Sequence, residues 1–365
     1  VLSAMGKTTD GLIAKAHEIN PNPPKRELDM LLVTGEQVSV ALMAMAMSSL
    51  GVPAVSLNAA QVVMHTSSAY GSAKLKRIDA ERIRHELESR RIVIVTGFQG
   101  INKYDDFTTL GRGGSDTTAV ALAAALHADV CEIYTDVEGV YTADPRVVPN
   151  ARKLAEVSYD EMLEFASLGA KVLHNRSVEM AKKYGVKLVV LSSLTRAEGT
   201  IVKEETKVER TLISGVAADA SVARISVLGV ENKPGITFRV FNLLAKNHIN
   251  VDIIIQSVTE PGKKDISFTV AKTDLSDTMD LLRENRESLT AREIVSEEGV
   301  AKLSVIGAGM CSNPGVAAKM FEALYSADVN TEMIATSEIR ITALIDERDV
   351  KRAMRAVHDA FDLAD

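Results

Sequence analysis

The sequence predicts an α/β protein, with a mostly parallel sheet in a first domain and two small βαββαβ modules after it. Apolar runs of strand length alternate with helical patterns over the first 200 residues, which is typical of parallel strands buried on both faces. A glycine-rich segment, 108–116, directly precedes one of the helical patterns. Beyond residue 210 the chain repeats at a spacing of 80 positions, as between Gly229 and Gly309, and such a repeat indicates two copies of one module.

The first domain is expected to contain four buried strands and five helices. Each strand is a short run rich in Val, Ile and Leu, and each helix shows the period of 3.6 residues. The strands are expected at 52–57, 92–98, 130–135 and 187–191. The helices are expected at 36–50, 79–89, 117–127, 159–166 and 170–183. Residues 1–6 have the pattern of a strand end. In such sheets ligands bind beyond the carboxyl ends of the strands, where the glycine-containing segments fall.

Each copy of the repeat is expected to run strand, helix, strand, strand, helix. The first copy places these elements at 224–230, 236–247, 251–258, 265–271 and 275–287. The second places them at 302–307, 316–327, 332–337, 339–345 and 348–361. A Pro-Gly pair starts the first helix of both copies, because proline suits a first helical turn. The second copy has no closing strand, so a strand at 211–217 is expected to complete one module. The expected domain limits are 1–206, 207–299 and 300–365.

Composition excludes several classes of protein. A net charge of -7 and a pI near 5.6 argue against binding to nucleic acid. The stretch 38–64 carries no charged residue, but Gly51 and Pro53 interrupt it, which argues against a membrane span. The two cysteines, Cys131 and Cys311, are read as buried packing residues in a protein of the reducing cytoplasm. The seven histidines show no metal-ligand spacing, and no metal ligand is expected among the side chains of the chain.

Residues Thr108 to Asp116 read T-T-L-G-R-G-G-S-D, a pattern suited to binding an anion. Glycines let backbone N–H groups approach a ligand, and Arg112 adds a fork of donors that fits a carboxylate or a phosphate. The helix expected from Thr117 would place its positive end at this loop. A plain glycine turn ahead of a buried helix is the alternative, but such a turn does not require Arg112, Ser115 and Asp116 together.

In its ordered motifs the chain resembles the aspartokinases, which phosphorylate the side-chain carboxylate of aspartate. The motifs are S-A-M-G-K-T-T-D (3–10), T-G-E (34–36), G-F-Q-G (97–100), the glycine-rich segment, E-I-Y-T-D-V-E-G-V-Y-T-A-D-P-R (132–146) and G-A-K-V-L-H (169–174). The resemblance covers essentially the full chain. It implies an amino-acid-kinase fold for the first domain and two ACT regulatory modules, both of the βαββαβ type, for the remainder.

The resemblance also implies roles for individual residues, with ATP and Mg²⁺ as cofactors. Arg112, Asp116 and Lys171 would be catalytic, with Asp116 orienting a lysine or assisting magnesium. L-Aspartate would be bound by Thr9, Glu36, Arg112, Gly113, Gly114 and Ser115. The nucleotide would be bound by Thr135, Asp136, Tyr141, Asp144, Arg146 and Lys171. Taken alone, Glu36 reads more simply as a charge at a helix start, Lys171 as a solvated helix residue and Tyr141 as packing at a strand edge; only their order along the chain favours these roles.

For the modules the resemblance implies feedback by lysine, threonine or both. The effector would contact Asn232, Gly235, Ile236, Thr237, Asn250, Val251, Asp252 and Gln256. Many family members have Asp where Asn232 stands, and an amide offers no charge to the ammonium group of a ligand. In the second copy Ser312 and Asn313 are read as helix caps. The resemblance further implies a homodimer through the ACT modules or a heterotetramer with a separate regulatory chain.

One motif of the family, Lys-(Phe/Tyr)-Gly-Gly-(Thr/Ser)-Ser, is not found before Val1. Its lysine contacts the transferring phosphate in the family, so we expect about forty further N-terminal residues of that type, a strand-helix-strand unit, to restore turnover. Two other functions stay open: an amino-acid-kinase fold enzyme that acts on another acceptor, and a non-catalytic amino-acid-binding subunit. The tandem modules and the pairing of Glu36 with Arg112 disfavour the former, and the intact motifs of the first domain disfavour the latter.

Overall fold

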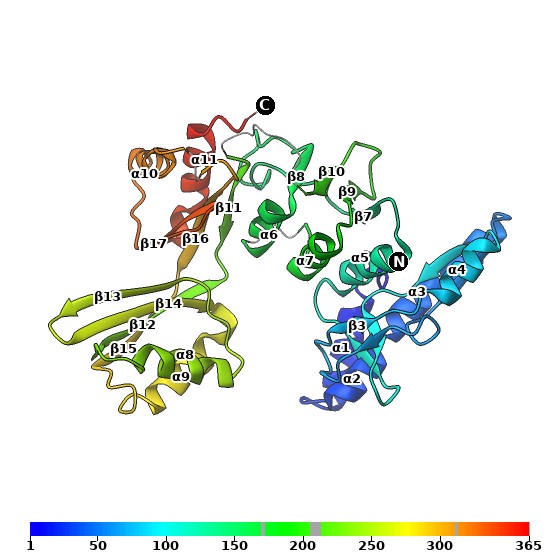
Figure 1. Ribbon diagram of the computed structural model, residues 1–365, viewed down its shortest axis with the longest axis horizontal. Helices are drawn as coiled ribbons and strands as arrows, with labels where there is room; N and C mark the ends of the chain where they lie inside the picture. The colour runs from blue at the N-terminus through cyan, green and yellow to red at the C-terminus, as the bar shows by residue number, and fades with distance from the viewer. Residues whose placement is uncertain (169–171, 205–212, 311–312, 365) are drawn as a thin grey trace. The chain divides into compact units, whose positions relative to one another are not determined.

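The computed structural model describes residues 1–168, 172–204, 213–310 and 313–364, and they form two compact units. Unit 1 comprises Val1–Val140, Ala155–Ala166 and Lys171–Thr206. Unit 2 comprises Tyr141–Leu154, Ser167–Ala170 and Lys207–Asp365. Figure 1 shows both units and labels many of their helices and strands. The fold is mixed α/β, as the sequence predicts.

Unit 1 begins with three helices, of which only the third was predicted. They are α1 (Thr8–Ile19), α2 (Lys25–Leu32) and α3 (Thr34–Ser49). Residues 1–6 were expected to end a strand, but they contribute only an isolated parallel bridge between Leu2 and Thr96. The helical run Lys25–Ser49 is long and apolar enough to cross a membrane by length and composition, a test that core helices also pass. Two carboxylates in this run, Asp29 and Glu36, are buried by contacts within the unit.

Two small sheets follow in unit 1. Strands β1 (Ala54–Leu57) and β4 (Ile92–Val95) pair in parallel, and α4 (Glu81–Glu88) precedes β4. Val95, Leu57 and Leu122 belong to one buried cluster, which places the helix that follows the glycine-rich loop against this pair. The second sheet has the order β3-β2-β5-β6. Its strands are β2 (His65–Thr66), β3 (Leu75–Arg77), β5 (Gln99–Ile101) and β6 (Phe107–Thr109).

The last sheet of unit 1 has the order β7-β9-β10-β8. Its strands are β7 (Cys131–Thr135), β8 (Glu156–Ser158), β9 (Leu188–Ser192) and β10 (Thr200–Lys203). Strands β7 and β9 are parallel, as their apolar runs predict. The helices of this region are α5 (Gly114–Leu126), α6 (Tyr159–Ser167) and α7 (Asn175–Tyr184). The helix predicted from residue 170 begins only at Asn175, because the imidazole Nδ1 of His174 accepts a hydrogen bond from the Arg176 N–H and caps the helix there.

Unit 2 contains the two repeated modules. Module 1 has the sheet order β13-β14-β12-β15, and α8 and α9 lie together on one face of it (Figure 1). Its elements are β12 (Val222–Glu231), α8 (Ile236–Lys246), β13 (Ile254–Glu260), β14 (Lys263–Ala271), η1 (Lys272–Asp274), α9 (Leu275–Glu284) and β15 (Glu293–Glu297). The first-copy elements were therefore predicted within a few residues. Buried apolar side chains between the helices and the sheet, among them Ile225, Val240 and Phe268, make the module core.

Module 2 is completed by a strand that precedes module 1 in the sequence. Strand β11 (Gly215–Asp219) pairs antiparallel with β16, giving the order β11-β16-β18-β17. The other elements are β16 (Val300–Ile306), α10 (Val316–Ser326), β17 (Met333–Thr336), β18 (Arg340–Asp346), η3 (Glu347–Asp349) and α11 (Val350–Ala360). The predicted strand at 211–217 is confirmed from Gly215 onward, while 211 and 212 lie outside the described residues.

The segment Tyr141–Leu154 also belongs to module 2, although the first domain surrounds it in sequence. Ala143, Val148 and Ala151 are part of the same buried cluster as Leu303 and Val357. The backbone O of Thr142 accepts a hydrogen bond from the Val216 N–H at 2.7 Å, so the segment is joined to β11 as well as to the core. Tertiary packing therefore groups residues differently from the order of the sequence.

Candidate functional site

The glycine-rich loop adopts a backbone that few residues other than glycine tolerate. Gly111 and Gly113 have φ values of +77° and +65°. A Cβ on Gly113 would lie 2.2 Å from the Cβ of His174, and one on Gly111 would lie 3.2 Å from the backbone O of Gly71. Conformation and close packing both require glycine here. Gly113 immediately precedes α5, so the free N–H groups of the first helical turn adjoin the loop.

Arg112 stands between these two glycines and is exposed to solvent. Its guanidinium makes no hydrogen bond or ion pair with any residue in the described part of the chain. Five N–H donors are therefore available to a ligand at the positive end of α5. A planar carboxylate, which can take two parallel hydrogen bonds from a guanidinium, matches this arrangement.

Helix α5 begins at Gly114, three residues earlier than predicted. The left-handed conformation of Gly113 turns the chain into the helix at once, so Ser115 and Asp116 lie in the first turn and not in the loop. Burial raises the pKa of Asp116 to about 6. Ser115 packs closely on Gly97, because a Cβ on that glycine would lie 2.5 Å from the Ser115 Oγ. A cation beside Asp116 would favour its charged form.

Glu36 carries a buried carboxylate with one unused oxygen. Only 3% of the residue surface is exposed. Its Oε1 accepts a hydrogen bond from the Ala4 N–H at 3.1 Å, whereas Oε2 is buried and has no hydrogen-bond partner among the described residues. Burial raises the pKa of this carboxyl above its usual range. An ammonium group would supply both the missing hydrogen bond and the missing charge.

Two further buried side-chain oxygens have no hydrogen-bond partner among the described residues, and both belong to a segment that is hydrogen-bonded to the segments next to Glu36. They are Thr96 Oγ1 and Gln99 Oε1. Gln99 Nε2 donates to the backbone O of Val33 at 3.1 Å, directly before α3, and the Gly97 N–H donates to the backbone O of Leu2 at 2.9 Å. The segments 2–4, 33–36 and 96–99 are thus bonded to one another. Sequence reasoning noted the G-F-Q-G motif but assigned no role to Thr96 or Gln99.

Thr9, the remaining residue expected to bind the substrate, lies in α1 and is partly buried. The hydroxyl of its neighbour Thr8 donates to the backbone O of Met5 at 2.7 Å and helps to start this helix. Thr9 therefore sits in a first helical turn, where a hydroxyl and free N–H groups are both present.

The residues expected to bind the nucleotide fall into both units. Thr135 ends β7 and Asp136 follows it, and the Thr135 Oγ1 donates to the Asp136 Oδ1 at 3.2 Å. The backbone O of Thr135 accepts from the Ser193 N–H at 2.8 Å, just past the end of the parallel neighbour β9. These two residues occupy the carboxyl edge of a parallel pair, where α/β sheets bind ligands.

Tyr141, Asp144 and Arg146 belong to unit 2. Arg146 Nη2 lies 2.7 Å from Asp144 Oδ2, and this guanidinium holds the pKa of Asp144 below its usual range. Tyr141 forms an isolated antiparallel bridge with Lys153. Lys171, expected to contact phosphate, lies outside the described residues. Within the described ranges no group of three or more His, Cys, Asp and Glu side chains could hold a metal ion.

In module 1 several of the residues expected to bind an effector come together. The Thr237 Oγ1 donates to the Gln256 Oε1 at 2.9 Å, which joins the start of α8 to β13. The buried Lys264 donates to the same Thr237 oxygen at 2.9 Å. Gly235 precedes α8 with a φ of +94°, and Ile236 is 5% exposed and belongs to the core. Ile236 therefore offers a ligand its backbone and not its side chain.

The other residues expected to bind an effector lie before α8 and before β13 in the sequence. The Asn232 N–H donates to the backbone O of Gly262 at 2.9 Å, and its exposed side chain is available to a ligand. Asn250, Val251 and Asp252 precede β13, which begins three residues later than predicted, at Ile254. In the second copy Ser312 lies outside the described residues, and the Asn313 Nδ2 donates to the backbone O of Gly309 at 2.9 Å.

Family models match most of the chain. The amino acid kinase family matches residues 1–192, and ACT domains match residues 223–287 and 303–361. An aspartokinase from a Bacillus species (strain MGA3) is 51% identical over 365 residues, which cover 100% of this chain and 89% of that protein. The chain belongs to the aspartokinase family. Aspartokinases are phosphotransferases with a carboxyl acceptor, so the chain is an enzyme of that class.

Solved aspartokinases share the fold described above. E. coli aspartokinase III in complex with aspartate and ADP, in its R-state, is 30% identical with a TM-score of 0.82, and 96% of this chain and 79% of that chain are covered. The same protein with lysine and aspartate, in its T-state, gives a TM-score of 0.74 at the same identity and coverage. The aspartate kinase from Synechocystis is 44% identical with a TM-score of 0.53, and this chain covers 63% of that longer chain.

Proposed function

We propose that the chain transfers the γ-phosphoryl group of ATP to the side-chain carboxylate of L-aspartate, which yields 4-phospho-L-aspartate and ADP. One observation carries the proposal: unit 1 presents an unpaired exposed cation, Arg112, and a buried carboxylate oxygen without a partner among the described residues, Glu36 Oε2. An α-amino acid carries the two complementary charges. The complex of E. coli aspartokinase III with aspartate and ADP supports the same substrates.

The substrate roles follow from the charges. Arg112 holds the α-carboxylate through its guanidinium fork, and Glu36 accepts the α-ammonium group. The N–H groups after Gly113 and Gly114 and the hydroxyls of Thr9 and Ser115 add hydrogen bonds at two helix starts. Together these groups fix both α substituents, so the side-chain carboxylate of aspartate remains free to react.

Phosphoryl transfer to a carboxylate brings two anions together, so the site contributes alignment and charge neutralisation. Thr135, Asp136, Tyr141, Asp144 and Arg146 are proposed to bind ATP, with Lys171 on its phosphates. Asp116 fits a role beside a cation, because burial alone raises its pKa to about 6 and a lysine or magnesium would reverse that shift. Magnesium, held mainly by the nucleotide phosphates, would neutralise their charge.

Module 1 is proposed to bind lysine, threonine or both as inhibitors. The contact between Thr237 and Gln256 supports the proposal, because it provides polar groups at a helix start beside exposed Asn232. E. coli aspartokinase III has been solved with lysine. A homodimer through the ACT modules, a heterotetramer with a regulatory chain and a cytoplasmic location belong to the same proposal, with lysine, threonine and methionine biosynthesis as its pathway.

A coupled assay of ADP release with aspartate and Mg·ATP tests the activity. When about forty N-terminal residues of the family type precede Val1, we expect turnover with aspartate and none with glutamate, and inhibition when lysine and threonine are added. Arg112→Ala is expected to cost about 2–5 kcal/mol of transition-state stabilisation, the scale for removing one member of a charged contact. The same variant is expected to weaken aspartate binding measured by calorimetry. Equal aspartate affinity in Arg112→Ala would reject the carboxylate role, and binding without ADP release would indicate a non-catalytic subunit.

A further inference from the structure

A buried carboxylate on α2 accepts hydrogen bonds where the glycine-rich loop begins. Asp29 is 1% exposed. Its Oδ2 accepts from the Thr109 N–H at 2.9 Å, and its Oδ1 accepts from the Thr109 hydroxyl at 2.8 Å. Both oxygens also accept from the Gly71 N–H, at 2.9 and 3.1 Å. The carboxylate thus binds the last residue of β6 to the turn that lies against Gly111.

A guanidinium from α7 joins the same two segments. Arg176 Nη1 donates to the backbone O of Leu110, and its Nη2 donates to the backbone O of Ala73 at 3.0 Å. The Ala73 N–H in turn donates to the backbone O of Thr109 at 2.9 Å. The segments 71–73 and 109–110 are therefore joined once by backbone and twice by charged side chains. Asp29 satisfies N–H and O–H donors, and Arg176 satisfies carbonyl acceptors.

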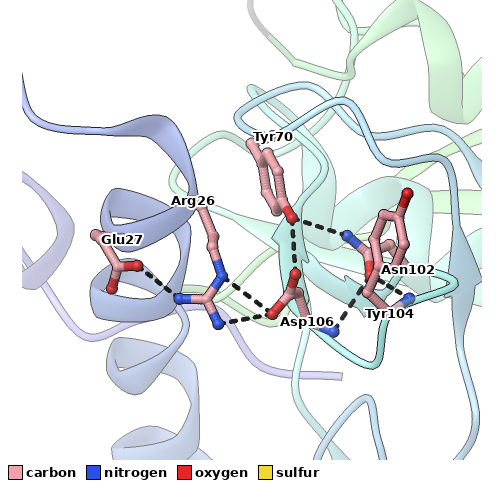
Figure 2. A network of polar contacts seen from close by, with 6 residues as sticks. All are labelled: Arg26, Glu27, Tyr70, Asn102, Tyr104 and Asp106. Carbon is pink, nitrogen blue, oxygen red and sulfur yellow. Dashed lines mark hydrogen bonds and ion pairs between the residues drawn. The ribbon is translucent and has the colours of Figure 1, made fainter.

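Helix α2 supports strand β6 at a second point. Arg26 lies three positions before Asp29 on the same helix and binds Asp106 with Nε at 3.1 Å and Nη2 at 2.7 Å (Figure 2). The Tyr70 hydroxyl donates to the other oxygen of Asp106 at 2.8 Å (Figure 2). The residue next to Gly71 is thus fixed as well. One face of α2 supports both ends of β6, which leads directly into the loop that carries Arg112.

We propose that Asp29 and Arg176 are positioning residues, which hold the Arg112 loop in its aspartate-binding shape before the substrate arrives. The proposal rests on the proposed function of Arg112. Neither residue faces the substrate in this scheme, because all the hydrogen bonds described for their side chains go to protein groups. Fixing the loop in advance lowers the entropy lost when aspartate binds, so the expected readout is aspartate affinity and not ATP affinity.

Asp29→Asn is the sharpest substitution, because it keeps size and shape. A carboxylate offers only acceptors to its four contacts, whereas an amide directs a nitrogen and its hydrogens at N–H or O–H donors. Thr109→Val removes one donor and spares the rest, and Arg176→Lys replaces the fork that reaches two carbonyls with a point charge. The control is Glu86→Gln on α4, where another buried carboxylate is paired with Arg82 and Arg91 away from the loop.

The test measures aspartate and ATP dissociation constants by calorimetry, together with Tm and the separate kcat and KM values. Asp29→Asn and Arg176→Lys are expected to weaken aspartate binding at least about fivefold, with ATP binding within about twofold. The aspartate dissociation constant of Thr109→Val is expected to lie between those of these two variants and that of the unchanged protein. This variant still tests the proposal if Asp29→Asn does not fold. Glu86→Gln is expected to lower Tm without changing either constant.

Two outcomes would overturn the proposal, and they are distinguishable. If Asp29→Asn and Thr109→Val lower Tm as Glu86→Gln does, but leave aspartate binding unchanged while Arg112→Ala abolishes it, Asp29 is structural only and the function of Arg112 stands. If Arg112→Ala itself leaves aspartate binding unchanged, the proposed function fails and the positioning role fails with it.

Discussion

The ammonium nitrogen of Lys302 lies 2.6 Å from the Asp252 Oδ2, so a side chain of module 2 already occupies a carboxylate expected to bind the effector in module 1. Lys302 is 5% exposed in its side chain and also lies 3.3 Å from Asp219 on β11. An effector ammonium at Asp252 would therefore have to compete with this lysine. Effector binding and the pairing of the two modules are expected to oppose each other.

Lys302→Met is accordingly expected to increase sensitivity to lysine or threonine. Removing the competing ammonium leaves Asp252 free for the effector, so the concentration for half inhibition is expected to fall several-fold. Stability is expected to fall by about 3 kcal/mol, because Asp219 and Asp252 both lose the ammonium group of Lys302, although Asp219 keeps its hydrogen bonds from Ser221. Inhibition curves at fixed aspartate, with denaturant unfolding alongside, measure both. A curve that is unchanged or moves to higher effector concentration would contradict the competition.

Glu36→Gln is expected to weaken aspartate binding by about tenfold or more, while ATP affinity is retained. The amide can still accept from the Ala4 N–H, but it no longer offers a charge to the substrate ammonium. Calorimetry with aspartate and with succinate, which lacks the amino group, separates the contributions. If succinate binding falls as much as aspartate binding, Glu36 does not contact the ammonium.

Asp116→Asn is expected to stabilise unit 1 near neutral pH while abolishing turnover. Burial raises the pKa of Asp116 to about 6, so the protonated form is favoured in the folded state. The stability that the neutral carboxyl of Asp116 contributes is full below the ordinary pKa and is lost as pH rises through about 6, a loss on the order of 3 kcal/mol. Unfolding of the two forms at pH 4 and pH 8 checks the sign. Asp116→Asn should have a higher free energy of unfolding than the unchanged protein at pH 8 and not at pH 4.

His358 gives unit 2 the opposite pH dependence. It is 0% exposed, its Nε2 lies 2.9 Å from the Thr142 Oγ1, and burial lowers its pKa below the usual value of 6.5. The Thr142 hydroxyl donates to the backbone O of Leu363, so the imidazole Nε2–H is the donor in this pair. The nearest carboxylate to the other ring nitrogen is Asp359, at 3.8 Å.

The stability that neutral His358 contributes is present above pH 6.5 and is lost as pH falls through its lowered pKa. Lowering pH from 7.5 to 5 is therefore expected to destabilise unit 2, and His358→Gln is expected to reduce that difference while keeping a donor near Thr142. Denaturant unfolding at both pH values, followed by hydrogen exchange in α11, measures the effect. An equal pH dependence in the variant would exclude His358 as its source.

The sequence allowed most helices of both units and most strands of unit 2 to be predicted, because their apolar periods are strong. Among the strands of unit 1 only β1, β4, β7 and β9 were predicted. The others, β2, β3, β5, β6, β8 and β10, are two to four residues long and too short to show a period. Helix α1 was also missed, since 1–6 were read as a strand end and the helical period from Thr8 is interrupted by Gly11. Asp29, Gln99 and Arg176 could not be predicted as site residues, because their hydrogen-bond partners are mostly backbone groups far away in sequence. Thr96 could not be predicted either, because only its burial in the fold distinguishes it. The roles of Arg112 and Glu36 stay predictions, although the structure leaves both side chains with capacity for a ligand.

The placement of Tyr141–Leu154 within module 2 has a consequence for dissecting the enzyme. A polypeptide cut after residue 206 would contain the whole match to the amino acid kinase family, yet it would expose Ala143, Val148 and Ala151, whose packing partners come from β11, β16 and α11. Such a fragment is expected to aggregate. In this chain the amino-acid-kinase part and the ACT part therefore do not separate at residue 206, because a segment that lies within the first domain in sequence contributes to the core of module 2.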